Sequence, residues 1–557
     1  MSKIAVALLL LAILIAGCSS STPTPLPTPT PTVTATATPL PPTPTPAPLR
    51  VWLDPAVPIA IRELIVTKLP VLTEQAKRAI TTAPSAQEAD LRVGLNYPVA
   101  LARWVYAVVV PFPTLADNVQ WVDIKRFWAG ELDTLAELSN GSNTPTLFVS
   151  PETLGVLYAL LGPASAKTPI TVTDTAQLLD AAWAARPNAW AIVPFHELEP
   201  RWKVLTVDRA NVLDKNLDVE SYPLAVSIGS DGSGAEELAK ELLPNGKVLT
   251  NRDTERMTVL VMTGVTALTR GIAHRMELKG ILYPAEKIGT LLRDADLTHI
   301  SNEIPFTEQC PTPDPNQKSL AFCSAPRYIE LLRAVGTDVI ELTGNHVKDY
   351  GSEAMLTTLE MYRREGWPYF GGGANLEEAR KPLMIEHNGN RLAFIGCNPV
   401  GPEYAWATAN SPGAAPYDIE YLQAEIAKLK AEGDIPIVTL QYWEFYQYEP
   451  TPQQQIDFRS MVDAGAAIVS GSQAHHPQAI EFYKGAFIHY GLGNLFFDQM
   501  WSLGTRQEIV DRHVIYNGRH IATELLTFML EDYSQPRPMT SEERKELLQA
   551  VFKASGW

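Results

Sequence analysis

Apolar and polar positions follow two different patterns along the chain. From Leu49 to about Leu243, helix-length segments such as residues 60–80 alternate with short apolar runs, namely "LRVGL", "YAVVVPF", "PTLFVS" and "AWAIVPF". Helical periodicity that alternates with short apolar strands is typical of an α/β domain. We therefore predict a first α/β domain over residues 49–245.

The second pattern begins near Asn251 and consists of apolar runs that each end in polar residues. These runs are "MTVLVMTGVT", "ADLTHISNE", "TDVIELTGNH", "RLAFIGCNP", "IPIVTLQYWE", "AAIVSGSQAHH" and "FIHYGLGN". Side chains at the carboxyl ends of strands in an α/β sheet gather in one crevice. The pattern predicts a second α/β domain over residues 251–535, with a polar site at its strand ends, and a C-terminal helix over residues 536–557.

The N-terminus carries a targeting signal. Residues 1–18 hold one Lys, an apolar run and small residues ahead of Cys18, which is typical of a secretory signal. "IAGC" resembles the lipobox of bacterial lipoproteins, and this resemblance implies acylation of Cys18. The alternative is an ordinary signal peptide or membrane anchor with an incidental Cys. We expect a lipid anchor on the extracytoplasmic face of the cell membrane.

Residues 19–48 are almost entirely Pro, Thr, Ala and Ser. Such a segment cannot form a core, and its prolines favour an extended polyproline geometry. It is predicted to be a stalk that holds the folded domains away from the bilayer.

Charge and cysteine content bear on the binding partners of the chain and on its disulfides. A formal charge of −17 argues against sequence-independent binding to nucleic acid, which requires clustered Lys and Arg. Cys310 and Cys323 flank a loop rich in Pro, and an oxidising compartment would let them form a disulfide. Cys397 lies in a strand-like run and is predicted to be a buried free thiol.

The first domain resembles type 2 periplasmic solute-binding proteins of the phosphate-binding sort. The resemblance rests on "WVYAVVVPFPTLADNVQWVDIKRFWAG" and on the stretch from "AWAIVPFHELEP" to "ESYPLAV". It covers about 190 residues, fewer than such two-lobed proteins have, and it carries no fingerprint for a ligand. The domain either binds a small solute or is a former binding fold that serves as a spacer.

The second domain resembles the CapA family of capsule and poly-γ-glutamate synthesis proteins. The most specific segments are "TDVIELTGNHVKDYGSEAMLTTLEMYRREGWPYFGGGANLEEAR" and "IVSGSQAHHPQAIEFYKGAFIHYGLGNLFFDQ". The resemblance implies a four-layer αββα metallophosphoesterase-like fold. It also implies partners in the synthesis of an anionic cell-surface polymer.

The same resemblance implies a metal site that uses Mn, Fe or Zn. By motif, Glu303, Asn345, His346 and His475 are the expected metal ligands. His346 is also a candidate general acid, and Asp349 is the acid that would orient it.

Several positions depart from the motif of the family. Val265 stands where the family has an Asp, and Gln441 replaces a His. Ser472 and Gln473 stand where paired His residues are expected. The Asn that precedes the family Glu falls at Ser301, although the neighbouring Asn302 is an alternative. These departures predict at most one weakly held metal ion, or none.

Two functions remain open on these residues. The chain is either a metal-dependent hydrolase with a reduced site or a scaffold that holds an envelope polymer without turnover. The sequence contains no Gly-x-Ser-x-Gly elbow and no phosphate-binding Gly-rich loop ahead of a Lys, which disfavours serine hydrolases and nucleotide-dependent kinases. His476 is predicted to be a packed loop residue. Ordinary core or surface histidines, with no acidic or His partner at ligand spacing, are predicted at His196, His387, His489, His513 and His520.

Overall fold

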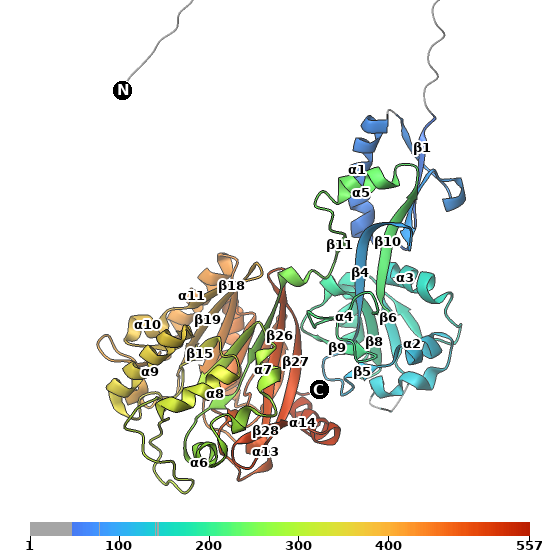
Figure 1. The fold of residues 1–557 in the computed structure, drawn as a ribbon. Helices are drawn as coiled ribbons and strands as arrows, with labels where there is room; N and C mark the ends of the chain where they lie inside the picture. The colour runs from blue at the N-terminus through green and yellow to red at the C-terminus, as the bar shows by residue number, and fades with distance from the viewer. Residues whose placement is uncertain (1–46, 77, 140, 142–143) are drawn as a thin grey trace, which may run out of the picture. The chain divides into compact units, whose positions relative to one another are not determined.

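A computed structural model describes residues 47–557 except 77, 140 and 142–143 (Figure 1). The signal segment, Cys18 and most of the stalk lie outside the described residues. Within the described part of the chain, none of the helices combines the length and the apolar character needed to span a membrane.

The first domain is built on one eleven-stranded sheet with the order β2-β1-β3-β10-β4-β8-β6-β7 (Figure 1). Its strand β4 (Val99–Pro111) is long and buried over most of its length, and it joins two halves of the sheet. The first half of β4 pairs with β10 (Ala225–Gly232), and the second half pairs with β8 (Ala189–Pro194) and β9 (Trp202–Val207). The remaining strands are β1 (Leu49–Leu53), β2 (Ile80–Thr82), β3 (Leu91–Leu95), β5 (Asn118–Val119), β6 (Thr146–Val149), β7 (Ile170–Val172) and β11 (Leu249–Thr250).

The helices of the first domain fall into two groups that follow the two halves of the sheet. Helices α1 (Ile59–Ala76) and α5 (Ala235–Leu242) pack together. The other half carries α2 (Trp121–Trp128), α3 (Pro151–Leu161) and α4 (Thr175–Ala184). Helix α1 ends earlier than predicted, because Ile80 already pairs with Leu49 as a strand.

The second domain contains two large sheets and a small sheet of two strands, β17 (Gly372–Gly373) and β20 (Gly413–Ala414). The larger has the order β16-β15-β14-β12-β26-β27-β28, with β13 and β25 attached, and the smaller has the order β18-β19-β21-β22-β24-β23. The strands of the larger sheet are β12 (Met257–Met262), β13 (Val265–Thr266), β14 (Leu297–Asn302), β15 (Val339–Glu341), β16 (Tyr369–Phe370), β25 (Asn494–Phe496), β26 (Gln507–Tyr516), β27 (Arg519–Glu531) and β28 (Gln535–Pro538). Those of the smaller sheet are β18 (Leu383–His387), β19 (Asn390–Cys397), β21 (Ile435–Gln441), β22 (Ile468–Ser472), β23 (Ile480–Tyr483) and β24 (Ala486–His489).

Three hydrophobic clusters arrange these sheets as layers. One cluster joins the larger sheet to α6 (Arg270–Lys279), α7 (Gly289–Arg293), α8 (Ile329–Ala334) and α9 (Gly351–Glu365). A second joins the smaller sheet to α10 (Leu376–Arg380), α11 (Ile419–Ala431) and α12 (Pro452–Ala464). The third lies between the sheets, where residues such as Leu260 and Val339 pack with Phe394 and Ile437. The predicted four-layer αββα arrangement is therefore confirmed.

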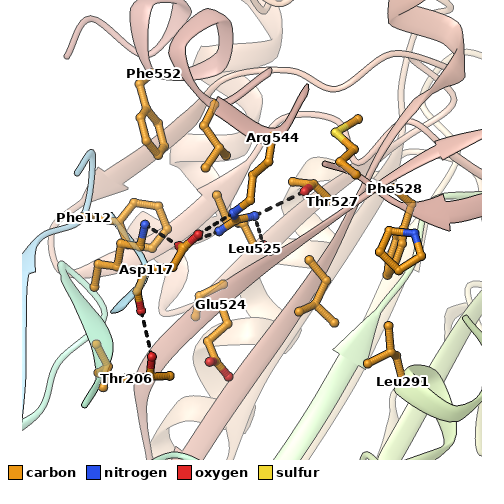
Figure 2. Close-up of a pocket in the computed structure, with 17 residues that line it drawn as sticks. Phe112, Asp117, Thr206, Leu291, Glu524, Leu525, Thr527, Phe528, Arg544 and Phe552 are labelled. Carbon is orange, nitrogen blue, oxygen red and sulfur yellow. Dashed lines mark hydrogen bonds and ion pairs between the residues drawn. The ribbon is translucent and has the colours of Figure 1, made fainter. Parts of the chain in front are cut away.

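The C-terminal helix α14 (Ser541–Ala554) is shorter than predicted, since residues 535–538 form β28 beside β27. Near α14, a cavity of about 300 Å³ is lined by residues of both domains (Figure 2). In it, Asp117 of the first domain forms ion pairs with Lys203 and with Arg544 of α14. Burial opposes ionisation of Asp117, but the hydrogen bonds from Arg544 and the charge of Lys203 hold its pKa well below the usual range. The two domains are thus joined by a charged contact.

Candidate functional site

Polar side chains from four strand ends of the second domain converge on one point. Glu303 directly follows β14, and Asn345 and His346 follow β15. Gln441 is the last residue of β21, and Gln473 comes directly after β22. The carboxyl ends of parallel strands lie at one edge of a sheet, so this convergence is the one that the sequence pattern predicts.

The amide of Gln441 occupies the centre of this convergence. Its Nε2 lies 2.9 Å from Oε1 of Glu303 and 2.8 Å from Oε1 of Gln473. The same nitrogen lies 3.2 Å from Oδ1 of Asn345. An amide nitrogen carries two hydrogens, so these three oxygens share two donors. A neutral amide therefore fills the position toward which the oxygens point.

Glu303 is fully buried beside the Gly344 turn. A Cβ added to Gly344 would lie 2.8 Å from the Glu303 Cα, so only glycine lets the turn approach this closely. Burial raises the pKa of Glu303 to about 7, although the charge of His346 and the hydrogen bond from Gln441 oppose that rise. The carboxyl group is therefore close to half-protonated at neutral pH.

His346 is held by a carboxylate. Its Nδ1 lies 2.7 Å from Oδ2 of Asp349, which also accepts a hydrogen bond from the Phe322 amide. The other oxygen of Asp349 accepts from the Tyr404 hydroxyl at 2.9 Å. Burial opposes protonation of His346, but its bond to Asp349 and the Glu303 charge raise its pKa above the usual value. Asp349 thus lies where it can orient His346 and stabilise its charged form.

His475 lies next to this group but has a different partner. Its Nδ1 lies 2.8 Å from Oδ1 of Asn494, and its ring packs against Phe497. Burial lowers the pKa of His475 to about 4, so the ring is neutral at pH 7. Both Gln473 and His475 have positive φ angles of 73° and 51°. Such left-handed conformations are uncommon for residues other than glycine and cluster at functional sites.

The positions that depart from the family motif are buried. Val265 is inaccessible to solvent and lies in register between Ser301 and Asn494. Asn302 is not a substitute for Ser301, because its side chain donates to Tyr362 of α9 at 2.7 Å and to the Ile304 carbonyl.

A two-metal centre, which the family resemblance implies, would need several carboxylate and His ligands at this point. Glu303 supplies a carboxylate at the convergence point, and the Gln441 amide presents hydrogens there instead of a lone pair. A cation at this point would require that amide to turn over. Within the described residues, no group of three or more His, Cys, Asp or Glu side chains is placed to hold a metal ion. The residues do not fit a two-metal centre.

An arginine beside the site was missed by the sequence reasoning. Arg270 pairs with Asp498, and its guanidinium lies over the rings of Phe322 and Phe497 at 5.0 Å and 4.8 Å. Burial raises the pKa of nearby Glu444, whose charge interacts with His346 and Arg270. The sequence gives only a weak indication that Arg270 lies beside Asp498 and the two Phe rings, because these residues are far apart along the chain.

The structure contains a disulfide between Cys310 and Cys323, as predicted. The chain segment that it closes leads to Phe322, which contacts the His346 ring at a centroid distance of 4.7 Å. Cys397 is a buried free thiol, also as predicted.

Four of the histidines expected to lack an acidic or His partner do have one, and His387 is the first, with its Nε2 4.0 Å from Oδ1 of Asp296. His489 is buried with its Nδ1 2.8 Å from Oδ2 of Asp511. His513 and His520 contact each other across β26 and β27 with ring nitrogens 3.3 Å apart. The prediction for these four was wrong. Pairing of β26 with β27 places His513 beside His520, whereas His489 meets Asp511 because their strands belong to two sheets that pack together. His476 is packed against Tyr448 as predicted.

The first domain has its own junction of side chains between α1 and α3. The Glu152 carboxylate, in the first turn of α3, accepts a hydrogen bond from the amide of Ile59 at the start of α1. Burial and the charge of Glu152 raise the pKa of nearby Glu197 to about 7. A helix N-terminus is a common site for anions, and here a carboxylate of the protein already lies at that of α1.

The second domain is similar in sequence to known proteins. Residues 259–499 match the family model "Bacterial capsule synthesis protein PGA_cap". The chain is 27% identical to "Capsule biosynthesis protein CapA" of Bacillus anthracis over 296 residues, which are 52% of this chain and 71% of that protein. The second domain is therefore similar to the CapA family over these residues. The chain is also 32% identical over 191 residues to "PGA biosynthesis protein CapA" of Bacillus subtilis, covering 34% of this chain and 50% of that protein. It thus spans only half the length of the second relative.

Solved structures give weaker likenesses. A 5'-nucleotidase precursor from Thermus thermophilus matches with a TM-score of 0.31 and 16% identity, covering 53% of this chain and 58% of that one. An ABC-type phosphate transport receptor from Vibrio cholerae matches with a TM-score of 0.28 and 12% identity, covering 35% of this chain and 92% of that one. Scores this low carry no argument, so the fold rests on the sheets described above.

Proposed function

We propose that this chain is a surface lipoprotein that assists the synthesis or anchoring of a capsule or other envelope polymer, and that its CapA-like site binds without turnover. Support for the process comes from the names of its relatives, which are capsule and PGA biosynthesis proteins. Support for the location comes from the signal segment, Cys18 and the Pro/Thr-rich stalk.

The observation that carries the absence of turnover is the place of Gln441. Its amide nitrogen lies 2.8–3.2 Å from side-chain oxygens of Glu303, Asn345 and Gln473, so the amide hydrogens face these oxygens. Metal-assisted hydrolysis needs a cation that lowers the pKa of a bound water and polarises the substrate. The amide supplies neither effect, and buried Val265 offers no ligand.

The second candidate function is a metal-dependent phosphoesterase that acts on an envelope substrate. It is favoured by the His346–Asp349 pair, since an oriented histidine with a raised pKa suits a general acid. In that case one ion of Mn, Fe or Zn would be held by Glu303, Asn345, His346 and His475. The Gln441 amide and the Asn494 partner of His475 argue against this arrangement.

For the first domain we propose a spacer role. The Glu152 carboxylate at the start of α1 and the acidic Glu197 nearby would repel an anionic solute. This charge arrangement supports a former binding fold over an active phosphate-binding domain.

Genetic complementation tests the proposal. A strain that lacks the chain is expected to lose surface polymer, and the parent chain should restore it. Variants His346→Ala and Glu303→Gln should restore the polymer as well, because turnover at the site is not required. Loss of complementation by His346→Ala, at unchanged protein level, would favour the phosphoesterase instead.

A further inference from the structure

Three buried histidines lie together between the two large sheets of the second domain. His489 lies on β24 of the smaller sheet, whereas His513 and His520 lie on β26 and β27 of the larger sheet. The ring of Phe487, in the core between the sheets, contacts all three rings at centroid distances of 5.4–6.3 Å. We call these three histidines the histidine cluster. The cluster therefore spans the surface on which the two sheets pack.

The hydrogen bonds of His513 and His520 suit neutral rings only. Nε2 of His520 lies 3.0 Å from the Ala522 carbonyl oxygen, which can only accept, so this nitrogen carries a hydrogen. Nδ1 of His513 lies 3.3 Å from the same nitrogen and 2.9 Å from the Thr523 hydroxyl, so it is the acceptor in this group. A proton added to Nδ1 of His513 would place two N–H donors against each other.

Few negative charges face the cluster. Nδ1 of His489 lies 2.8 Å from Asp511. His299 of β14, whose charge would also act on His513, lies 3.1 Å from Glu341 of β15. These two carboxylates would compensate only two of the four rings if the cluster and His299 were all charged.

The solvent side of the cluster is lined by cations. His520 borders a cavity of about 330 Å³, which Lys430, Lys484 and Arg519 also line. Lys484 is paired with Asp463, and Arg519 donates to a backbone carbonyl of the first domain. The cavity brings water close to His520, and its cations add to the repulsion that a charged ring would meet.

We propose that the histidine cluster is an acid-sensitive switch, which holds the two sheets together at neutral pH and opens them when its rings are protonated. A charged imidazole needs water or a carboxylate, and separation of the sheets admits water. The bond between Gln441 and Glu303 joins the same two sheets, so opening would also break up the candidate site. The inference goes beyond the proposed function and holds whether or not that site turns over.

The pH range of the switch follows from the pKa values of the two rings. Burial lowers the pKa of His520 to about 4. Burial and the charges of neighbouring histidines lower the pKa of His513 well below the ordinary 6.5. The contribution of such a ring to the closed form is fully present above the ordinary pKa and is lost as the pH falls toward the folded pKa. Each of the two rings should therefore raise the opening equilibrium constant roughly 30-fold between pH 7.5 and pH 5.

Hydrogen–deuterium exchange on the full chain in detergent, measured by mass spectrometry at pH 7.5 and pH 5, tests the inference. After correction for the intrinsic pH dependence of amide exchange, opening of β24, β26 and β27 should rise about 30-fold or more at pH 5. Strands β6 and β8 of the first domain should change less. The double variant His513→Asn with His520→Gln should lose most of this rise, because its amides replace the bonded ring nitrogens but do not take up protons.

The matched control is His274→Asn, which removes a histidine of α6 outside the cluster. It should keep the acid response of the parent. The single variant His520→Gln changes the ring at the rim of the cluster, 9% exposed, and should lose part of the response even if the double variant does not fold. Equal opening of the parent at both pH values would overturn the inference. An acid response that the cluster substitutions leave unchanged would overturn it as well.

Discussion

The amide nitrogen of Gln441 lies 2.9 Å from Oε1 of Glu303, at the ends of strands β21 and β14 that belong to different sheets. This bond links the two sheets of the CapA-like domain at the candidate site. It also fixes the chemistry there, because an amide donor stabilises a buried carboxylate without supplying the charge of a cation.

Gln441→Glu should turn this contact from attractive to repulsive. The substitution places a second carboxylate against Glu303, and a buried charge without a partner costs about 3 kcal/mol or more. We expect a lower melting temperature at pH 8 in EDTA and recovery when Mn²⁺ is added, since the oxygens could then share a cation. The control Gln549→Glu, exposed on α14, should change neither value. An unchanged melting temperature with no response to Mn²⁺ would show that the amide is not at the centre of the site.

Glu303 predicts a dependence of stability on pH. Its pKa is about 7 in the folded chain, whereas the ordinary pKa of a Glu side chain is 4.5. A carboxyl group with a raised folded pKa binds its proton more tightly in the folded state. Its stabilising contribution is therefore fully present below about pH 4.5, and about 3 kcal/mol is lost as the pH rises through 7.

Urea unfolding at pH 5 and pH 8.5, compared between the parent and Glu303→Gln, measures this contribution. The free energy of unfolding of the parent should fall more with rising pH than that of the variant. His346, whose pKa is also raised, contributes in the same direction in both proteins. Equal slopes for the two proteins would contradict the assignment of a buried, protonated Glu303.

The Cys310–Cys323 disulfide should stabilise the loop beside His346. It closes a segment with a sequence separation of 13, and a loop of this size is worth about 3 kcal/mol in the chain-entropy model. Alkylation of the unfolded, unreduced chain should label Cys397 and neither Cys310 nor Cys323. Cys310→Ser with Cys323→Ser should lower the free energy of unfolding. Labelling of all three thiols would refute the pairing.

Cys18→Ala tests the proposed lipid anchor. Without an acylated Cys18 the protein has no lipid chains to insert, so it should leave the membrane fraction. Membrane fractionation after a high-salt wash distinguishes the anchor from surface adsorption. A variant that stays membrane-bound would show that another segment holds the protein there.

The strands of the second domain were predictable from the sequence, because each is an apolar run that ends in polar residues. The rule that strand ends converge was enough to place Asn345 and His346 at the candidate site. The direction in which each side chain points could not be predicted in the same way. Asn302 donates to Tyr362 of α9 rather than to the site, and that outcome depends on packing 60 residues away.

Long-range pairing explains the other differences. His489 meets Asp511 only because β24 and β26 belong to two sheets that pack together, and no sequence spacing encodes that contact. The place of the Gln441 amide likewise depends on three loops at once. The substitution of a His by Gln was visible in the sequence, but the hydrogen bonds that it forms were not.

Metal content and turnover, measured on the same preparation, decide whether the candidate site hydrolyses a phosphoester. The purified chain is equilibrated with Mn, Fe and Zn, dialysed and analysed for bound metal, while hydrolysis of a generic phosphodiester is followed for the parent and for His346→Ala. Our account predicts less than one equivalent of tightly bound metal and no turnover that His346→Ala alters. Two equivalents of tightly bound metal, or hydrolysis that His346→Ala abolishes, would contradict it.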